Sequence, residues 1–128
     1  MYEPKLKKDI RCPLEYGLDV FGGKWKSRII SVLYKQDSVR YSTLRKEMCT
    51  ITDTVLASTL KELIRDGIIE RKQYDGVPLR VEYSLSEKGL SVVPILESIC
   101  RWGSIYCQET NENTLMQCQK CDYLTIKK

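Results

Sequence analysis

The chain has 128 residues, which is enough for one domain with a hydrophobic core and too few for a second domain of ordinary size. Hydrophobic residues make up 42% of it, and neither an apolar membrane span nor an apolar leader is evident, so we expect a soluble, cytoplasmic protein without a membrane partner. The sequence contains no histidine, the commonest general base and metal ligand, which argues against most enzymes, and we expect no cofactor.

The net charge of +4 is unevenly distributed. Residues 1–85 contain 16 Lys/Arg and 12 Asp/Glu, whereas residues 86–128 contain five of each kind. An excess of positive charge in the first part is compatible with a polyanionic partner. The six cysteines of a chain this long, without a secretory leader, indicate reduced thiols rather than a disulfide framework.

The first half of the chain is predicted to be mostly helical. Proline is favoured at the first helical position, so Cys12-Pro13 marks the start of a helix with Cys12 at its N-cap, and Gly22-Gly23 ends it. Up to residue 50 the remaining pattern predicts a basic arm over 1–11, a helix over 25–35, an extended segment over 38–41, and a helix over 42–48 capped by Ser42.

The segment from Ile51 to Ile69 predicts the best-bounded helix of the chain. Thr52 is a suitable N-cap, Asp53 places a negative charge in the first turn, and Gly67 is placed to end the helix. One face carries the apolar stripe of Leu56, Leu60, Leu63 and Ile64. The opposite face carries small hydroxyl and charged side chains, which suits DNA base edges and phosphates, although an ordinary solvated surface is the alternative.

After Gly67 the hydrophobic pattern changes from helical to alternating. Residues 68–74 and 80–85 predict two strands joined by a turn at Asp75-Gly76. Ser86 then caps a last long helix, which we expect to bend or break near Pro94. This helix has too many apolar positions to cover one small core, which indicates a partner chain.

A helix, a tight turn, a helix and a two-stranded hairpin are the elements of a winged helix-turn-helix. The predicted fold class is therefore mainly α with a small β-hairpin (α+β). Five separated motifs follow this order: Cys12-Pro13, the Gly-Gly-Lys-Trp-Lys run of Gly22 to Lys26, Tyr41-Ser42-x-Leu44-Arg45, the spacing of Leu56, Leu60, Leu63 and Gly67, and the run from Val77-Pro78 to Gly89. In these motifs the chain resembles the HxlR-type bacterial transcriptional regulators, relatives of the MarR proteins.

The resemblance runs from about Cys12 to Gly103. It implies a homodimer, formed through the N-terminal and C-terminal helices, that binds double-stranded DNA at an inverted-repeat operator. The expected organisation is a basic arm over 1–11, a DNA-binding and dimerisation domain over 12–110, and a tail over 111–128 that lies outside the resemblance and contains Cys118-x2-Cys121.

Three groups of DNA contacts are predicted on this fold. Ser and Thr can bond to several bases and Val can touch a thymine methyl, so these residues do not define one operator sequence. The predicted base contacts are Thr54, Val55, Ser58, Thr59 and Lys61, with Thr52 and Asp53 at the start of the helix. The predicted phosphate contacts are Ser42, Thr43, Arg45, Lys46 and Arg65, and the predicted wing contacts are Lys72, Gln73 and Arg80. For the charged residues, a solvated side chain is the alternative.

Cys12 is the candidate sensor of redox state or of reactive electrophiles. The helix dipole and the neighbouring Arg11 both favour its thiolate, and a buried, inert cysteine is the alternative. In the redox-responsive branch of the family it resembles, a cysteine before this proline is the sensor, with a small oxidant or electrophile as inducer. Cys49 is a candidate disulfide partner, across the dimer, and whether oxidation switches DNA binding on or off stays open.

The other cysteines have alternative roles. Cys100 and Cys107 lie seven residues apart and are predicted to be small apolar residues of a dimer seam. Cys118 and Cys121 have the spacing of a zinc knuckle, which would need a second pair from the partner chain, or of a dithiol. A thiol-disulfide oxidoreductase that uses this pair, or a winged-helix module that binds only protein, are the alternatives to a DNA-binding regulator.

Overall fold

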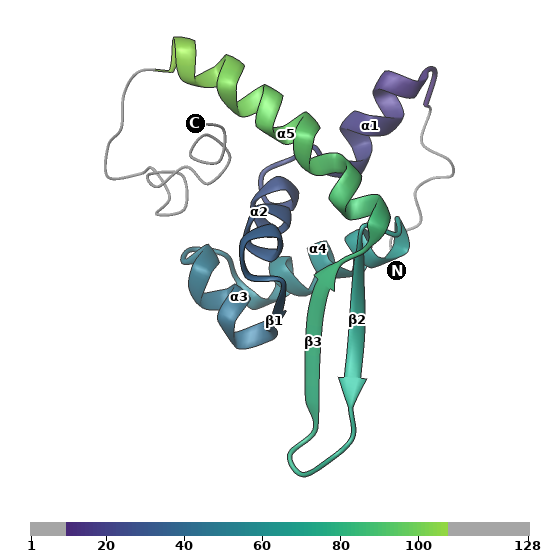
Figure 1. The fold of residues 1–128 in the computed structure, drawn as a ribbon, viewed down its shortest axis with the longest axis vertical. Helices are drawn as coiled ribbons and strands as arrows, with labels where there is room; N and C mark the ends of the chain where they lie inside the picture. The colour runs from purple at the N-terminus through teal and green to yellow at the C-terminus, as the bar shows by residue number, and fades with distance from the viewer. Residues whose placement is uncertain (1–9, 108–128) are drawn as a thin grey trace.

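The computed structural model describes residues 10–107, which form five helices and three strands (Figure 1). In chain order these are α1 (Pro13–Phe21), α2 (Lys26–Gln36), β1 (Ser38–Arg40), α3 (Tyr41–Met48), α4 (Asp53–Arg65), β2 (Ile69–Tyr74), β3 (Arg80–Leu85) and α5 (Glu87–Tyr106). The predicted α+β class is confirmed. Most of the basic arm and the tail, including Cys118 and Cys121, lie outside the described residues.

Local capping explains where the helices begin. Cys12 is the N-cap of α1 with Pro13 in the first turn, as predicted. The hydroxyl of Thr52 accepts a hydrogen bond from the amide of Val55 at the start of α4 (3.2 Å). At the start of α5, the hydroxyl of Ser86 accepts one from the amide of Gly89 (3.0 Å). Each hydroxyl satisfies an amide that has no partner within its own helix.

Two helix features differ from the prediction. Ser42 is not an N-cap: α3 begins at Tyr41, because β1 continues in its pairing with β3 up to Arg40, which becomes the N-cap. The break expected near Pro94 is absent, because the last helix runs without interruption through 20 residues; the alternative of a bend there stays a prediction. Pro94 lies on the exposed side of α5, where water can replace the backbone hydrogen bond that proline cannot make.

The three strands form one antiparallel sheet in the order β1-β3-β2. β2 and β3 pair along their whole length, from Ile69 opposite Leu85 to Tyr74 opposite Arg80. The short β1 pairs with the other edge of β3, with Val39 opposite Tyr83. Only the base of this sheet meets the helices, and the β2–β3 hairpin extends well beyond them as the wing (Figure 1).

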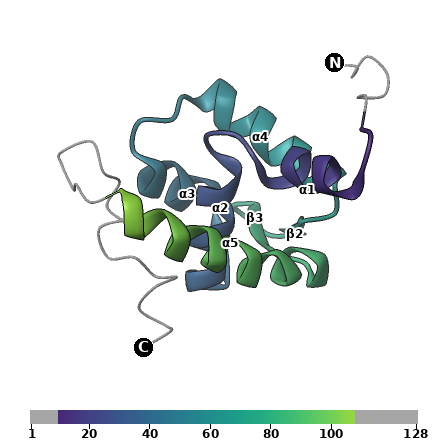
Figure 2. The same ribbon diagram turned by 90° about the horizontal axis from the view of Figure 1, so that it is seen from above.

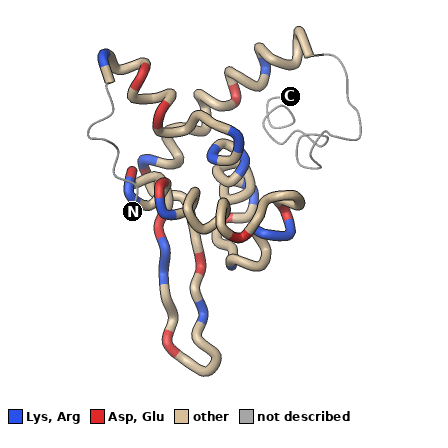
Figure 3. Tube along the Cα trace, turned by 180° about the vertical axis from the view of Figure 1, so that it is seen from behind, with Lys and Arg blue, Asp and Glu red and all other residues tan. Residues whose placement is uncertain are grey.

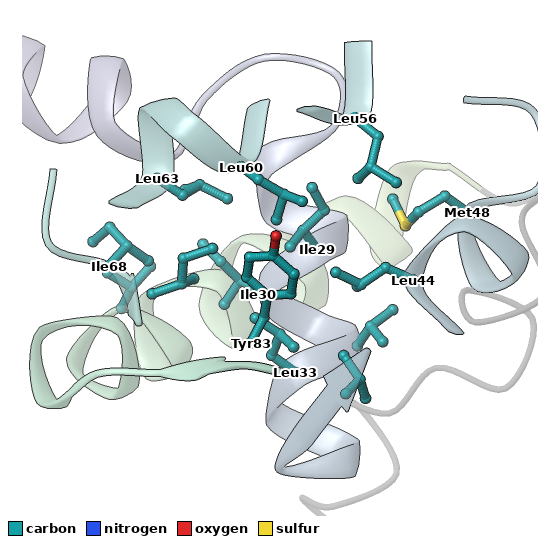
Figure 4. Close-up of a cluster of buried hydrophobic side chains, with 14 of the residues drawn as sticks. Ile29, Ile30, Leu33, Leu44, Met48, Leu56, Leu60, Leu63, Ile68 and Tyr83 are labelled. Carbon is teal, nitrogen blue, oxygen red and sulfur yellow. The ribbon is translucent and has the colours of Figure 1, made fainter. Parts of the chain in front are cut away.

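The core surrounds α2 (Figure 4). Ile29, Ile30 and Leu33 of this helix are at most 1% exposed. They face buried side chains from α3, α4 and the base of the wing: Leu44, Met48, Leu56, Leu60, Leu63, Ile68 and Tyr83. α3 and α4 are thus packed on a shared support. No helix in the described part of the chain is both long and apolar enough to cross a membrane.

The molecule has two distinct ends. Figure 1 shows α1 and the distal part of α5 on the side away from the wing, with α2, α3 and α4 between them and the free end of the wing. The start of α1 and the end of α3 lie on opposite sides of the molecule in both views.

Candidate nucleic-acid interface

α4 has one buried face and one polar face. Leu56, Leu60 and Leu63 are at most 3% exposed and hold the helix on the core. On the other side, four of the side chains predicted to contact bases are exposed: Thr54, Val55, Ser58 and Lys61. The structure thus brings a short row of hydroxyl, methyl and ammonium groups onto one surface, and these groups can hydrogen-bond to base edges or contact a thymine methyl.

Thr59, also predicted to contact a base, does not belong to this surface. It is 8% exposed, and its hydroxyl donates to the carbonyl of Val55 (2.7 Å), which satisfies the group within the helix. Ile64, predicted in the buried stripe, is instead 37% exposed. The buried face of α4 is therefore rotated toward Thr59, which lines a hollow formed with the α1–α2 loop at Gly22 to Lys26.

α3 supplies the second part of the candidate interface. Ser42 and Lys46 are exposed, and Thr43 is half-buried. Arg45 is also half-buried, and its Nε lies 2.6 Å from Oδ1 of Asp53, the first residue of α4. The candidate phosphate ligand of α3 is therefore already paired with an acid at the start of α4.

Asp53 accepts hydrogen bonds from two residues of α3. Besides Arg45, the hydroxyl of Tyr41 donates to Oδ1 of Asp53 (3.1 Å). The hydrogen bond from Arg45, followed by that from Tyr41, lowers the pKa of the Asp53 carboxyl below its ordinary value, and the same contact raises the pKa of Arg45. Burial, followed by the hydrogen bond to Asp53, raises the pKa of Tyr41. At neutral pH this contact therefore joins a carboxylate, a guanidinium and a protonated phenol.

The wing carries both signs of charge (Figure 3). Lys72 and Gln73 are exposed on β2, as a contact with the DNA backbone requires. Arg80 on β3 lies over the ring of Tyr74, 4.5 Å from its centroid, and its Nε is 3.3 Å from Glu82. Because Tyr74 lies opposite Arg80 in the strand pairing, the guanidinium of Arg80 is held over one face of the hairpin.

The C-terminal half of α4 is held by a charged group that lies far from it in sequence. Lys26 of α2 has a side chain only 13% exposed, and its ammonium lies 3.0 Å from Glu62 of α4 and donates to the carbonyl of Asp19 (3.1 Å). Arg65, a predicted phosphate ligand, is 3.5 Å from Asp66. The Lys26–Glu62 and Tyr41–Asp53 contacts could not be predicted from the sequence, because residue types alone do not indicate which side chains of different helices will pair.

Cys12 and Cys49 both have exposed side chains. The alternative of a buried Cys12 is therefore wrong. Arg11, expected to support the Cys12 thiolate, is instead bound through its side chain to Glu15, and this contact lowers the pKa of Glu15. Cys49 follows α3 with a φ of 57°, and its thiol donates to the carbonyl of Lys46 (3.7 Å).

The two thiols cannot meet within one chain in this conformation. A disulfide requires Cα atoms within about 7 Å. The start of α1, where Cys12 lies, and the end of α3, where Cys49 lies, are on opposite sides of the molecule (Figures 1 and 2). Among the remaining described cysteines, Cys100 is half-buried in α5 and Cys107 is the exposed C-cap of that helix.

The arrangement of a short helix, a tight turn, a supported second helix and an extended hairpin matches a known family. The model of the family described as HxlR-like helix-turn-helix matches residues 20–111. The chain belongs to this HxlR-like family. The resemblance found in the sequence motifs is thereby confirmed.

Individual relatives agree with this assignment. The uncharacterized HTH-type transcriptional regulator BH0655 of Halalkalibacterium halodurans is 44% identical over 102 residues, which cover 80% of this chain and 90% of the relative. The redox regulator HypR in its oxidized form has a TM-score of 0.70 at 37% identity, covering 77% of this chain and 100% of HypR. The reduced form of the transcriptional regulator YodB from Bacillus subtilis has a TM-score of 0.69 at 28% identity, covering 80% of this chain and 100% of YodB.

These relatives establish the class of protein. The HxlR-like chain is a transcriptional regulator with a helix-turn-helix of the DNA-binding kind, formed by α3 and α4, and it is not an enzyme. The predicted winged helix-turn-helix is confirmed, and the predicted alternative of a thiol-disulfide oxidoreductase is wrong.

Proposed function

We propose that this HxlR-like regulator binds an inverted-repeat operator as a homodimer and that oxidants or electrophiles control it through Cys12. The observation that carries the DNA-binding part is the exposed row of Thr54, Val55, Ser58 and Lys61 on a helix whose opposite face is fixed to the core. A helix presented in this way can enter the major groove while its support stays rigid.

In this proposal each element has its own role on DNA. The row on α4 contacts base edges, with Thr52 at the start of the helix, and α3 contacts phosphates. The wing lies along the neighbouring backbone. The proposed phosphate and wing contacts are Ser42, Thr43, Arg45, Lys46, Arg65, Lys72, Gln73 and Arg80. Their polar or cationic groups suit phosphate oxygens, and most of these side chains are exposed.

The homodimer is proposed from the apolar surface of α1 and α5. Large apolar side chains on both helices are exposed in the single chain: Leu14, Tyr16 and Leu18 on α1, and Ile95, Ile99, Trp102, Ile105 and Tyr106 on α5. Apolar groups that gather on one side of a monomer favour association. A symmetric pair would present its two α4 helices to half-sites one helical turn, roughly 34 Å, apart.

The sensor role is proposed from the exposed thiols and from the relatives. Cys12 is solvent-accessible at a helix N-terminus, and one structural relative is named a redox regulator. Since Cys12 and Cys49 of one chain lie far apart, the proposed disulfide joins Cys12 of one protomer to Cys49 of the other. An oxidant would accept the two electrons and two protons that the thiols release. Such a bond would constrain the distance between the two α4 helices.

DNA binding is tested by the salt dependence of a mobility shift. Lys46→Gln should weaken binding to selected and random duplexes alike and reduce the slope of log K against log salt by about one unit. Lys24→Gln is the control, because Lys24 is an exposed lysine in the α1–α2 loop, outside the proposed contacts. Equal slopes for the Lys46→Gln variant and the wild type would remove Lys46 from the interface.

The sensor is tested by oxidation of the full-length protein. Treatment with diamide or a hydroperoxide should produce a disulfide-linked dimer on a non-reducing gel and change the affinity for DNA. Cys12→Ser should abolish both effects, whereas Cys107→Ser should retain them. A Cys12→Ser protein that responds like the wild type would refute the sensor role and leave the DNA-binding proposal standing.

A further inference from the structure

The first residue of α4 is an acid on a surface proposed to approach a polyanion. Asp53 has a side chain 69% exposed and lies next to Thr54 and Val55, which are proposed to contact bases. From the sequence, Asp53 is predicted to contact DNA at the start of this helix. An exposed carboxylate close to phosphates would oppose binding by repulsion, so its location requires another explanation.

We infer that Asp53 is a positioning residue, which holds Arg45 and the N-terminus of α4 in the arrangement that binds DNA and does not itself contact a base. The inference rests on the proposed DNA-binding function. It adds that Arg45 of α3 binds phosphate while Asp53 of α4 holds Arg45 in position. Tyr41 has the same positioning role, because its hydroxyl also donates to Asp53.

The first support is the geometry of the ion pair. The carboxylate of Asp53 accepts from Nε of Arg45 at 2.6 Å, across the turn that joins α3 to α4. A guanidinium has five N–H donors in a fixed plane, so the bond at Nε leaves four N–H groups on the terminal nitrogens. Arg45 is 41% exposed along its side chain and can therefore bind a phosphate while it stays attached to Asp53. The carboxylate fixes a flexible arginine before DNA arrives, which reduces the entropy lost on binding.

The second support is the link to the core. Tyr41 is partly buried against the hydrophobic core, and its hydroxyl lies 3.1 Å from Oδ1 and 3.4 Å from the main-chain oxygen of Asp53. Asp53 is thus joined to a side chain that the core holds in place. Since Tyr41 and Arg45 both belong to α3, one carboxylate fixes the start of α4 against the preceding helix at two points.

The third support is the balance of charge. Asp53 occupies the first turn of α4, where a negative charge suits the helix dipole. Paired with Arg45, it adds little net negative charge to the candidate interface. Replacing Asp53 therefore removes a negative charge from a DNA-facing surface and also releases a cation. If Asp53 has a positioning role, the release of Arg45 outweighs the removal of the negative charge, and binding to DNA weakens.

The experiment is a double-mutant cycle on the full-length protein, with two DNA probes. One probe is a duplex selected by the wild-type protein from a random pool, and the other is a random duplex of the same length. Asp53→Asn should weaken binding to both probes by about five- to twentyfold and reduce the salt slope by about one unit, because Arg45 no longer holds its phosphate. Arg45→Gln should give a similar loss, and the double variant should be no weaker than Arg45→Gln alone.

Two further variants separate positioning from folding and from charge. Tyr41→Phe keeps the ring and removes only the hydroxyl, and it should weaken both probes by about two- to fivefold. Asp75→Asn removes an exposed acid from the turn of the wing and should leave affinity unchanged or slightly higher. Circular dichroism and urea unfolding should show that all variants are folded at the assay temperature.

The alternatives give different results. If Asp53 contacts a base, Asp53→Asn changes which duplex is selected and leaves the random probe unaffected. If Asp53 is only a repulsive charge, Asp53→Asn binds both probes more tightly. Additive losses in the double variant would also overturn the positioning role. If the wild type selects no sequence and binds random DNA without salt dependence, the proposed function itself fails, and the inference fails with it.

Discussion

α4 and α5 are both rich in large apolar residues, but the single chain covers the apolar face of α4 and only the first half of α5. In α4, Leu56 and Leu63 are fully buried against the core. In the distal part of α5, Trp102 and Tyr106 are 66% and 70% exposed, and their rings pack on one another with centroids 5.4 Å apart. The same kind of side chain therefore stabilises the monomer in one helix and lies on its surface in the other.

The change from buried to exposed apolar side chains occurs within α5. Its first half is held by the core through Val92, Val93 and Leu96, each at most 6% exposed. Beyond Leu96 the helix extends away from the core (Figure 1). Proximal α5 thus belongs to the folded unit that supports α4, whereas distal α5 has the character of an interface. If the chain forms the proposed homodimer, folding and assembly therefore depend on separate residues, which substitutions can distinguish.

The largest effect is expected from the covered face of α4. Leu63→Ala deletes a side chain that is 0% exposed and leaves a cavity beneath the helix, so it should reduce the free energy of unfolding by about 2–5 kcal/mol. Urea denaturation followed by circular dichroism measures this loss. Ile64→Ala, at a residue 37% exposed on the same helix, is the control and should cost clearly less. Equal losses at the two positions would contradict the burial described for α4.

The second effect should fall on assembly and leave the fold intact. Trp102→Glu places a charge in the middle of the exposed face of distal α5, and a central interface tryptophan typically contributes about 2 kcal/mol or more to association. The dimer dissociation constant should therefore rise by roughly thirtyfold or more. Analytical ultracentrifugation over a range of concentrations measures it.

A matched substitution tests whether that effect is specific. Val77 at the tip of the wing is fully exposed, and Val77→Glu introduces the same charge far from α1 and α5. It should leave the dimer unchanged. If Val77→Glu dissociates the protein as strongly as Trp102→Glu, or if neither variant does, distal α5 is not the interface.

The third effect concerns the boundary where proximal α5 joins the core. The hydroxyl of Ser86 caps α5 and also lies 2.5 Å from the carbonyl of Gly67 and 2.9 Å from that of Ile68. Ser86→Ala should lower the free energy of unfolding by about 1–2 kcal/mol, since it removes the cap and the link to the end of α4. Thr52→Ala removes a cap that accepts a hydrogen bond from the amide of Val55, and it should cost about 1 kcal/mol. Urea unfolding of the two variants compares them directly, and a larger loss for Thr52→Ala would be the contrary result.

The sequence predicts the elements of this fold better than their contacts. Periodicity, Pro13, Thr52 and Ser86 are local features, and they correctly located the helices and most of their starts. The pairing of β1 with β3 could not be predicted, because it joins segments more than 40 residues apart. That pairing is also the reason why α3 begins before Ser42.

The candidate interface was also predicted in outline, because the helical period of α4 is a local feature of the sequence. The exposed polar side of α4 follows from its helical period, and only the rotation that buries Thr59 was missed, because it depends on the neighbouring α1–α2 loop. The pairing of Arg45 with Asp53 was missed because each residue, taken alone, suits a contact with DNA. Side-chain partners between helices are set by tertiary packing, which a single sequence does not display.

The smallest effect is expected from the pH dependence of the Arg45–Asp53 contact between α3 and α4. The pKa of Asp53 is lower in the folded chain than its ordinary value of about 4, so the folded state binds this proton less tightly than the unfolded state. The stabilisation is therefore complete above about pH 4 and is lost as the pH falls through the lower, folded pKa. Other carboxyls titrate in the same range, so the measurement is a difference: the urea midpoint of Asp53→Asn should fall less between pH 5 and pH 3 than that of the wild type. Because the pair is exposed, the difference should be small and should shrink further in high salt, and parallel pH profiles would mean that Arg45 does not stabilise the Asp53 carboxylate in solution.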